Sequence, residues 1–282
     1  SGTAHPGHPP RLVREAPLDR RRGNKIGGEE MSLALECTLL VPAVTLAVFW
    51  ASAQIGNWIG RRRKRAEGEE DEFDFLLGGA LTLLGLIVGF TFSMAVARYD
   101  QRKNYEEQEA NAIGTEYVRA DFLPAPDATK VRGLLRDYLG ERVRFYTSRD
   151  GEELRHIDAE TARLQAEMWS LVSAHASAQP TAVAALVASG MNDVLNSQGY
   201  TQAAWWNRIP TGAWLLVIAI GIFCNWLVGY GARGRWMILF LILPIALSIT
   251  LFLIADIDSP RGGVIRVSPH NLEAVVESLR GT

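Results

Sequence analysis

The sequence lacks most of the patterns that mark catalytic and metal-binding proteins. It contains only two cysteines, Cys37 and Cys224, and both fall inside apolar runs without a second thiol or a histidine at metal-ligand spacing. Its five histidines are scattered, and it has no phosphate-binding loop, nucleophile elbow or zinc helix motif. These absences argue against a disulfide framework, a zinc site and most enzyme classes, so we expect no cofactor and no metal.

The chain also lacks an excess of charge of either sign. Its 29 Lys and Arg residues nearly balance its 31 Asp and Glu residues, and a net charge of −2 gives no reason to expect a nucleic-acid partner. Hydrophobic residues make up 48% of the sequence, but they are gathered into blocks. Four blocks are long enough to span a lipid bilayer, at about 33–58, 75–97, 209–230 and 236–255. They predict a multi-pass protein of the cell (inner) membrane.

The second block continues directly into a charged helical pattern. No proline or cluster of turn residues occurs between Phe75 and Asp121, and the pattern stops only near Pro124. We therefore predict one long helix that leaves the bilayer and becomes the first helix of a water-exposed domain. Residues 98–208 keep helical spacing without strand-like alternation, which predicts a helical bundle between spans 2 and 3. The predicted fold is an all-α, four-span membrane protein.

The charged part of this long helix has a predicted core side and a predicted outer side. Ala110, Ile113 and Tyr117 recur at helical spacing and are expected to line the core. The acidic residues of the same stretch, among them Glu106, Glu109 and Glu116, are placed elsewhere around the helix.

The remaining segments complete the predicted domain plan. Residues 1–30 lack apolar periodicity and are expected to be a disordered leader. Residues 31–97 and 209–255 form two membrane hairpins, and residues 256–282 form a tail with a short helix. Ser268 is the predicted cap of that helix, because a proline follows it at the first helical position.

The second span carries two neighbouring stripes of residues at four-residue spacing. The small stripe consists of Gly85, Gly89, Ser93 and Ala97. The bulky stripe consists of Leu86, Phe90 and Met94. Small residues let helices approach closely in lipid, where apolar attraction between helices is weak. Either stripe is able to face a partner helix or a pore axis, and plain helix packing is the simpler interpretation.

A few polar residues lie in or near the spans. Asn225 is the one strongly polar residue deep in the third or fourth span, so its side chain should face protein or water. Asp256 and Asp258 follow the fourth span and form either an ion-binding ring in an oligomer or, as the favoured alternative, a solvated helix end paired with Arg261.

A basic cluster follows the first span and consists of Arg61, Arg62, Arg63, Lys64 and Arg65. We interpret it first as a solvated turn with a topology signal, and alternatively as a site for anionic lipid headgroups. The loop at 231–235 adds two basic residues on the same side of the membrane. The positive-inside rule then places both loops in the cytoplasm and the helical bundle outside.

Several segments resemble the bacterial bestrophin-like membrane family, a group of largely unassigned function. They are Arg-Tyr-Asp at 98–100, Glu-Ala-Asn-Ala-Ile-Gly-Thr at 109–115, Arg-Ala-Asp-Phe-Leu-Pro at 119–124, and the tail segments 258–262 and 266–269. These matches flank the soluble bundle in the right order, and the resemblance covers the chain from about residue 31.

The resemblance implies a more distant similarity to bestrophins, whose homopentamers conduct anions through a pore lined by the second span. Their apolar neck has bulky residues at four-residue spacing, as Leu86, Phe90 and Met94 do here. Bestrophins keep the helical domain in the cytoplasm, which conflicts with the basic-loop argument and leaves the orientation open. The dense acidic calcium clasp of animal bestrophins is missing, since only Asp256 and Asp258 follow the fourth span.

Three functional hypotheses remain. The first is a homo-oligomeric ion (anion) channel with the second span as pore wall and inorganic ions as its ligands. The alternative is a non-conducting membrane scaffold or sensor whose helical bundle binds a partner. A membrane enzyme is the weakest hypothesis, although a mechanism that uses only aspartates is compatible with the sequence.

Overall fold

The structure, a computed structural model, describes residues 20–62, 69–232 and 239–280, with side chains for 40–62, 71–232 and 241–280. The elements are α1 (Arg20–Arg62), α2 (Glu69–Arg119), the 3-10 helix η1 (Ala120–Phe122), α3 (Ala125–Thr147), α4 (Gly151–Ala178), α5 (Ala182–Trp206), α6 (Thr211–Ala232), α7 (Leu239–Asp258) and α8 (His270–Arg280). No strand occurs in these ranges, and the all-α prediction is confirmed.

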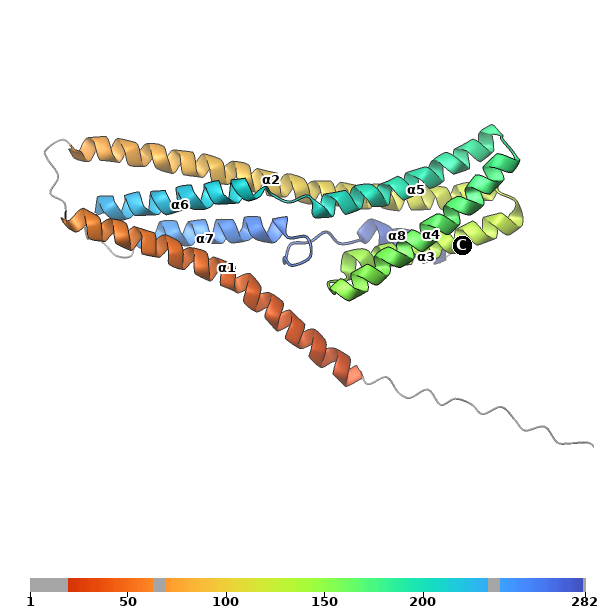
Figure 1. Cartoon of the computed structure of the whole chain (residues 1–282), viewed down its shortest axis with the longest axis horizontal. Coiled ribbons are helices and arrows are strands. Elements are labelled where there is room, and N and C mark those ends of the chain that lie inside the picture. The colour runs from red at the N-terminus through yellow and green to blue at the C-terminus, as the bar shows by residue number, and fades with distance from the viewer. Residues whose placement is uncertain (1–19, 63–68, 233–238, 281–282) are drawn as a thin grey trace, which may run out of the picture.

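The molecule is elongated, and α2 runs along most of its length (Figure 1). At one end, the first half of α2 lies with α1, α6 and α7. At the other end, its second half lies with α3, α4, α5 and α8. The predicted continuous helix from span to bundle is confirmed, because α2 is unbroken from Glu69 to Arg119.

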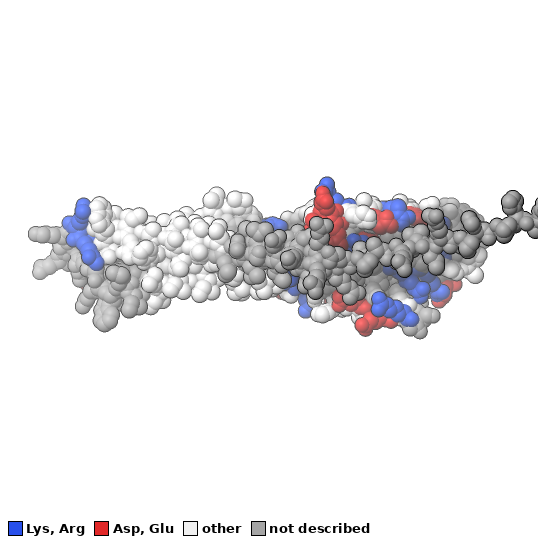
Figure 2. All heavy atoms as spheres, turned by 90° about the horizontal axis from the view of Figure 1, so that it is seen from below, with Lys and Arg blue, Asp and Glu red and all other residues white. Residues whose placement is uncertain are grey.

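Within the described residues, four segments are long and apolar enough to cross a membrane. They are Leu40–Arg62, Asp71–Phe122, Ala182–Ala232 and Leu241–Asp258. Each overlaps one of the four predicted spans, and the second and third contain the spans 75–97 and 209–230 in full. In the face shown in Figure 2, a belt without charged residues separates the arginines at the end of α1 from the charged bundle. The belt is the surface that a bilayer would surround.

Helices that follow each other in the chain are not always neighbours in the membrane part. Within the described residues α1 packs against α6 and α7, and it makes no contact with α2. The close approach of α1 to α6 depends on glycines, since a Cβ at Gly56 would clash with the Trp226 carbonyl and one at Gly229 with the Ala53 carbonyl. The two spans of the first predicted hairpin, 33–58 and 75–97, are therefore separated by α6.

The bundle forms around apolar residues at helical spacing. Ala110, Ile113 and Tyr117 of α2 are buried, as predicted from their spacing. Leu135 of α3 and Met168 of α4 belong to the same core. This core holds the second half of α2 against four other helices, whereas the first half has fewer neighbours.

Side chains directly before α4 and α5 fix where these helices begin. α4 begins at Gly151, because the Asp150 carboxylate accepts hydrogen bonds from the N–H groups of Glu152 and Glu153 at 3.3 and 3.0 Å. The Thr181 hydroxyl caps α5 by accepting the N–H of Ala184 at 3.1 Å.

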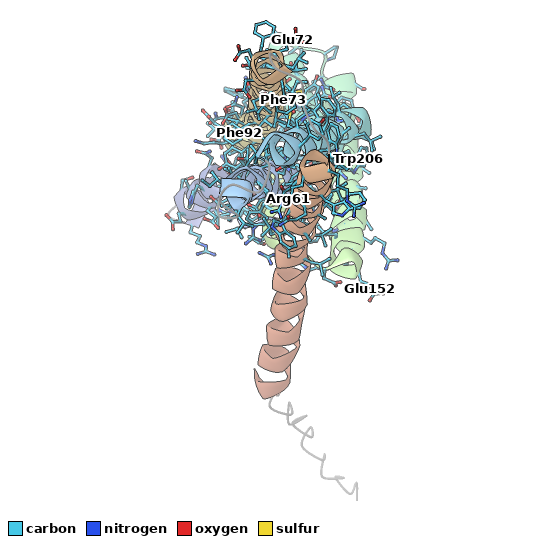
Figure 3. All side chains as sticks on the ribbon, turned by 90° about the vertical axis from the view of Figure 1, so that its left-hand side faces the viewer. Arg61, Glu72, Phe73, Phe92, Glu152 and Trp206 are labelled. Carbon is cyan, nitrogen blue, oxygen red and sulfur yellow. The ribbon has the colours of Figure 1, made fainter. Side chains whose placement is uncertain are left out.

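The predicted leader also differs from the structure. We expected disorder over 1–30, but α1 already begins at Arg20. No proline occurs between Pro17 and Pro42, so the helix of the first span is able to extend backwards, although it passes through Gly23, Gly27 and Gly28. Figure 3 shows this first part of α1 departing from the other helices. Residues 1–19 lie outside the described range.

Candidate functional site

The membrane half of α2 has one packed side and one open side. Leu84 and Ala95 are buried in the apolar cluster formed with α6 and α7. Thr91 is buried on the same side, and its hydroxyl donates to the Ile87 carbonyl at 2.8 Å, which satisfies it without another helix. The opposite side carries both predicted stripes.

The small stripe meets nothing in the described part of the chain. A Cβ built at Gly85 or at Gly89 would have no neighbour within 4 Å, and Ser93 is exposed. The glycines that do bring two helices together are Gly56 and Gly229, on α1 and α6. The close helix approach expected for the small stripe therefore does not occur within one chain.

The bulky stripe is also uncovered. Leu86, Phe90 and Met94 are 53%, 63% and 37% exposed. With a rise of about 1.5 Å per residue, these three side chains form an apolar strip roughly 12 Å long. In a membrane such a strip meets lipid, a second protein surface or a pore.

A polar hollow of about 610 Å³ lies where the apolar strip ends. It is lined by Met94, Ala97, Arg98, Asp100, Gln101, Asn104 and Asn207. Arg98 donates to the Asn207 side-chain carbonyl from one terminal nitrogen, while its buried Nε has no hydrogen-bond partner among the described residues. A cation is thus held at the border between the membrane half and the bundle half of α2.

Arg102 joins three helices one turn further along α2. It is 1% exposed and donates to the main-chain carbonyls of Ala204 at 3.2 Å, Ile257 at 3.1 Å and Asn207 at 3.3 Å, with Asp258 at 3.5 Å. These carbonyls lie at the ends of α5 and α7, where helix carbonyls lack partners and a cation is favoured. Burial lowers the pKa of Arg102, and the charge of Asp258 opposes this shift.

Glu106 binds the start of α8. Its buried carboxylate accepts the N–H groups of Asn271 at 2.9 Å and Leu272 at 3.0 Å, together with the Asn271 side-chain amide at 2.6 Å. An anion is favoured at a helix N-terminus because the first N–H groups are unpaired. The cap of this helix is therefore supplied by Glu106 and not by the predicted Ser268.

Glu109 and Arg142 form an ion pair inside the bundle. Both side chains are 0% exposed, and Arg142 donates to both carboxylate oxygens of Glu109. The same carboxylate accepts the hydroxyls of Tyr146 at 3.4 Å and Thr201 at 3.1 Å. These added hydrogen bonds satisfy the carboxylate, whereas Nη1 of Arg142 has no hydrogen-bond partner among the described residues.

Glu116 is also buried, but it has fewer polar partners than Glu109. Its carboxylate lies against Gly190 of α5, and neither oxygen has a hydrogen-bond partner among the described residues. Arg119 lies 4.0 Å away. Burial raises the pKa of Glu116 to about 8, with Arg119 opposing the shift and Asp193 adding to it.

The two aspartates after the fourth span are held inside the protein. Asp256 is 5% exposed and accepts the N–H groups of Val264 and Ile265 at 2.7 and 2.8 Å. Asp258 is 6% exposed and accepts the N–H of Ile209 at 3.1 Å. Both carboxylates fix main-chain segments, so the favoured description of a solvated helix end does not fit them.

Arg261 has other partners than the expected aspartates. It donates to the carbonyls of Phe145 at 2.9 Å and Ser148 at 3.1 Å, at the end of α3. Its guanidinium also lies over the rings of Phe145 and Trp205, at 4.5 and 4.4 Å from their centroids. Unpaired helix-end carbonyls and aromatic faces thus replace the predicted ion pair.

The remaining predicted residues lie in the membrane part. Asn225 is 0% exposed, and its amide donates to the Gly221 carbonyl at 2.8 Å, so it faces protein. Arg61 and Arg62 are exposed at the end of α1. The other three members of the basic cluster, Arg63, Lys64 and Arg65, lie outside the described residues.

The buried charges of the bundle are the functional candidates that the sequence argument missed. We placed Glu106, Glu109 and Glu116 elsewhere around the helix than its predicted core side, and the structure buries all three. A signal was present: Arg102, Glu106, Glu109 and Glu116 follow the same three- and four-residue spacing as the core residue Ile113. Charge type alone was a misleading guide to burial here.

The fold and sequence have known counterparts. A family model described as a Bestrophin-like domain matches residues 40–272. Crystal structures of three mutants of a bacterial Bestrophin homolog from Klebsiella pneumoniae are similar, with TM-scores of 0.59, 0.59 and 0.60 at 13%, 14% and 13% identity. The matches cover 87%, 85% and 86% of this chain and 99%, 98% and 96% of the crystal structures. At this identity the likeness concerns the fold. A search of curated proteins finds no match.

Proposed function

The chain belongs to the Bestrophin-like family, and from this premise we propose that it is an oligomeric ion (anion) channel of the cell (inner) membrane. In this proposal several copies form a ring, and the open side of α2 lines the pore. The observation that carries the proposal is the uncovered face of α2, which combines exposed bulky residues with glycines that meet no neighbour.

The two stripes suit the two surfaces that a ring requires. Each central helix of a ring faces the axis with one side and a neighbouring copy with the adjacent side. The bulky stripe of Leu86, Phe90 and Met94 would form an apolar neck at the axis. The small stripe beside it would let the next copy approach closely, because Gly85 and Gly89 add no side chain to the contact.

Arg98 is the feature of the polar hollow that supports conduction of anions. The hollow begins at Met94, where the apolar strip ends, and it is lined by Arg98 and also by Asp100. Apolar constrictions gate by dewetting, while a ring of cationic side chains favours anions at a pore mouth. A ring of copies would repeat Arg98 around the axis at the bundle end of the neck.

Planar bilayer recordings test this proposal. The purified full chain should conduct ions. Phe90→Ala should change conductance or gating, because it removes the most exposed side chain of the bulky stripe. Phe92→Ala is the matched control, since Phe92 lies half a turn away on the same helix and is 36% exposed. We expect Phe92→Ala to leave single-channel conductance unchanged.

Two results would contradict the channel proposal. One is the absence of current from pure, folded protein in both symmetric and gradient salt. The other is a monomer in detergent and in lipid, as measured by light scattering. A silent monomer would favour the alternative of a membrane scaffold or sensor, in which the buried network around Glu109 serves only to hold the bundle that binds a partner.

A further inference from the structure

Two arginines at the end of α1 flank an aromatic ring. The Arg62 guanidinium lies over the Trp58 ring, 3.9 Å from its centroid. Arg61 donates from Nε to the Asn57 side-chain carbonyl at 3.3 Å. Both arginines are exposed, and no carboxylate among the described residues forms an ion pair with either one. Their terminal nitrogens are available to an anion from outside the chain.

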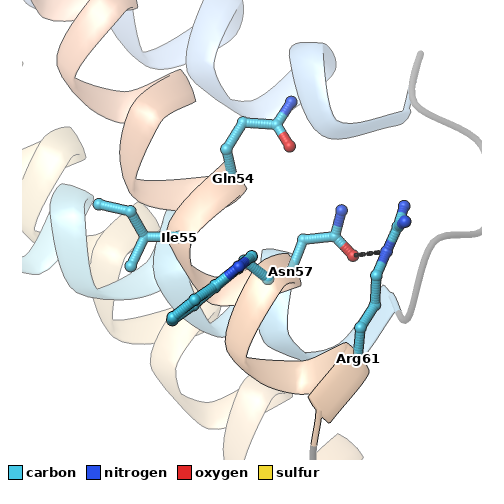
Figure 4. Close-up of a pocket in the computed structure, with 5 residues that line it drawn as sticks. Gln54, Ile55, Asn57 and Arg61 are labelled. Atoms are coloured by element: carbon cyan, nitrogen blue, oxygen red, sulfur yellow. Dashed lines mark hydrogen bonds between the residues drawn. The ribbon is translucent and has the colours of Figure 1, made fainter.

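A pocket of about 600 Å³ with polar side chains in its lining opens beside Arg61. It is lined by Gln54, Ile55, Asn57, Trp58 and Arg61. Figure 4 shows the two amide side chains and the Arg61 guanidinium along the same side of α1. Both arginines lie at the end of Leu40–Arg62, a segment long and apolar enough to cross a membrane. The pocket therefore lies at the depth where lipid headgroups meet the hydrocarbon core.

An apolar groove of about 520 Å³ adjoins this pocket. It lies between α1 and α6 and is lined by Val48, Ala51, Ser52, Ile55, Ala219, Ile222, Phe223 and Trp226. Ile55 lines both the groove and the pocket. Ser52 is satisfied internally, since its hydroxyl donates to the Ile222 carbonyl at 2.8 Å. The groove thus offers almost only apolar surface, directly below a cationic rim.

The dimensions of this combined surface fit a phospholipid. From Val48 to Arg61, α1 rises roughly 20 Å, at about 1.5 Å per residue. One leaflet contributes about 15 Å of hydrocarbon, half of a core about 30 Å thick. A phosphate held near Arg61 and Arg62 would leave an acyl chain at the height of the groove.

We propose that this surface is a binding site for an anionic glycerophospholipid. The phosphate is bound between Arg61 and Arg62 over Trp58, Gln54 and Asn57 bind polar headgroup atoms, and one acyl chain lies in the groove between α1 and α6. Arginine suits this task, because its planar guanidinium matches phosphate oxygens in pairs. The proposal does not depend on whether the protein conducts ions.

Lipid titration of the full chain, followed by native mass spectrometry, tests the site. The probes are a phosphatidylglycerol and a phosphatidylcholine with the same acyl chains. The double variant Arg61→Gln with Arg62→Gln should bind phosphatidylglycerol about tenfold or more weakly, and phosphatidylcholine about as before, because each arginine near the membrane surface contributes to anionic lipid binding. The variant Arg149→Gln with Arg155→Gln removes two exposed bundle arginines and should behave like the native chain.

A second variant distinguishes a lipid from a free anion. Ala51→Trp fills the groove without touching the arginines, and it should reduce phosphatidylglycerol binding several-fold. Inorganic phosphate alone should compete poorly, since it has no acyl chain to occupy the groove.

Three outcomes would overturn the proposal. They are equal binding of both lipids by the native chain, unchanged phosphatidylglycerol binding after loss of Arg61 and Arg62, and an equally large loss in the bundle control. A site for free anions would be indicated if inorganic phosphate displaced the lipid while Ala51→Trp had no effect, and this result also contradicts the lipid proposal. All positions changed are exposed, and circular dichroism checks that each variant is folded.

Discussion

The two halves of α2 belong to one unbroken helix but differ in what lies against them. In the membrane half, the side that faces away from α6 and α7 is bare: in the described part of the chain, a Cβ built at Gly89 would meet no other element within 4 Å, and Phe90 is 63% exposed. In the bundle half, Arg102, Glu106 and Glu109 are each no more than 1% exposed. Between Phe75 and Ala97 the open side of the helix carries no charged residue, whereas Arg102, Glu106 and Glu109 are charged and buried.

This difference shows which half is complete within one chain. Every buried charge from Arg102 to Glu109 finds its partners on other helices of the same chain. The membrane half differs, because the two stripes on its open side lie against no other element in the described part of the chain. The bundle half is therefore expected to determine stability, while the membrane half determines association and function.

The largest effect is expected where the bundle half buries a charge pair. Glu109→Ala leaves Arg142 charged and buried, and it should lower the free energy of unfolding by about 3–5 kcal/mol. Urea denaturation in detergent, followed by tryptophan fluorescence, measures this loss. Glu109→Leu combined with Arg142→Met removes both charges and should cost less than Glu109→Ala. A double variant as unstable as the sum of both single changes would contradict this account.

A smaller effect is expected at the cap of α8. Glu106→Gln removes the charge that accepts the N–H groups of Asn271 and Leu272, and hydrogen bonds to a charged group contribute about 1.5–3 kcal/mol. Limited proteolysis should release the C-terminal helix faster from this variant. Glu107→Gln, which changes an exposed neighbour, is the matched control and should be cut like the native chain. Equal rates for all three proteins would mean that Glu106 does not hold α8.

The third effect depends on pH and concerns Glu116. Its pKa is raised by burial from about 4.5 to about 8, so the folded state prefers the protonated carboxyl. The stability that this preference provides is fully present below about pH 4.5 and is lost as pH rises through about 8. Thermal midpoints measured from pH 5 to 9 should fall more steeply for the native chain than for Glu116→Gln. Parallel curves would show that Glu116 does not titrate in this range.

Much of α2 could be predicted from the sequence, but the role of its glycines could not. The absence of proline between Phe75 and Asp121 was sufficient to predict the long helix. Gly85 and Gly89 share their four-residue spacing with Gly56 and Gly60, yet only the second pair lies against another helix, α6. Spacing shows where another helix is able to pack closely, and only the fold shows whether one does so.

The buried charges were missed for a related reason. The partners of Glu106 lie 165 and 166 residues away, and Arg142 lies 33 residues from Glu109. A glutamate on a helix is assigned to the surface unless a distant partner is known, because burying it alone is costly. The two stripes on the open side of α2 could be predicted from the sequence, because they follow from residue spacing within a single helix.

The smallest effect on stability is expected in the membrane half of α2, at Gly89. Gly89→Ala adds a methyl group where no atom lies within 4 Å, and alanine favours a helix over glycine by up to about 1 kcal/mol. The unfolding free energy of the subunit should therefore stay the same or rise slightly. If the small stripe faces a neighbouring copy, the same methyl group should lower the oligomeric fraction measured by light scattering. Gly78→Ala, an equally open position nearer the start of α2, should change neither quantity. An intact oligomer in Gly89→Ala would assign the small stripe to lipid or to the pore, because only a closely packed contact is sensitive to one methyl group.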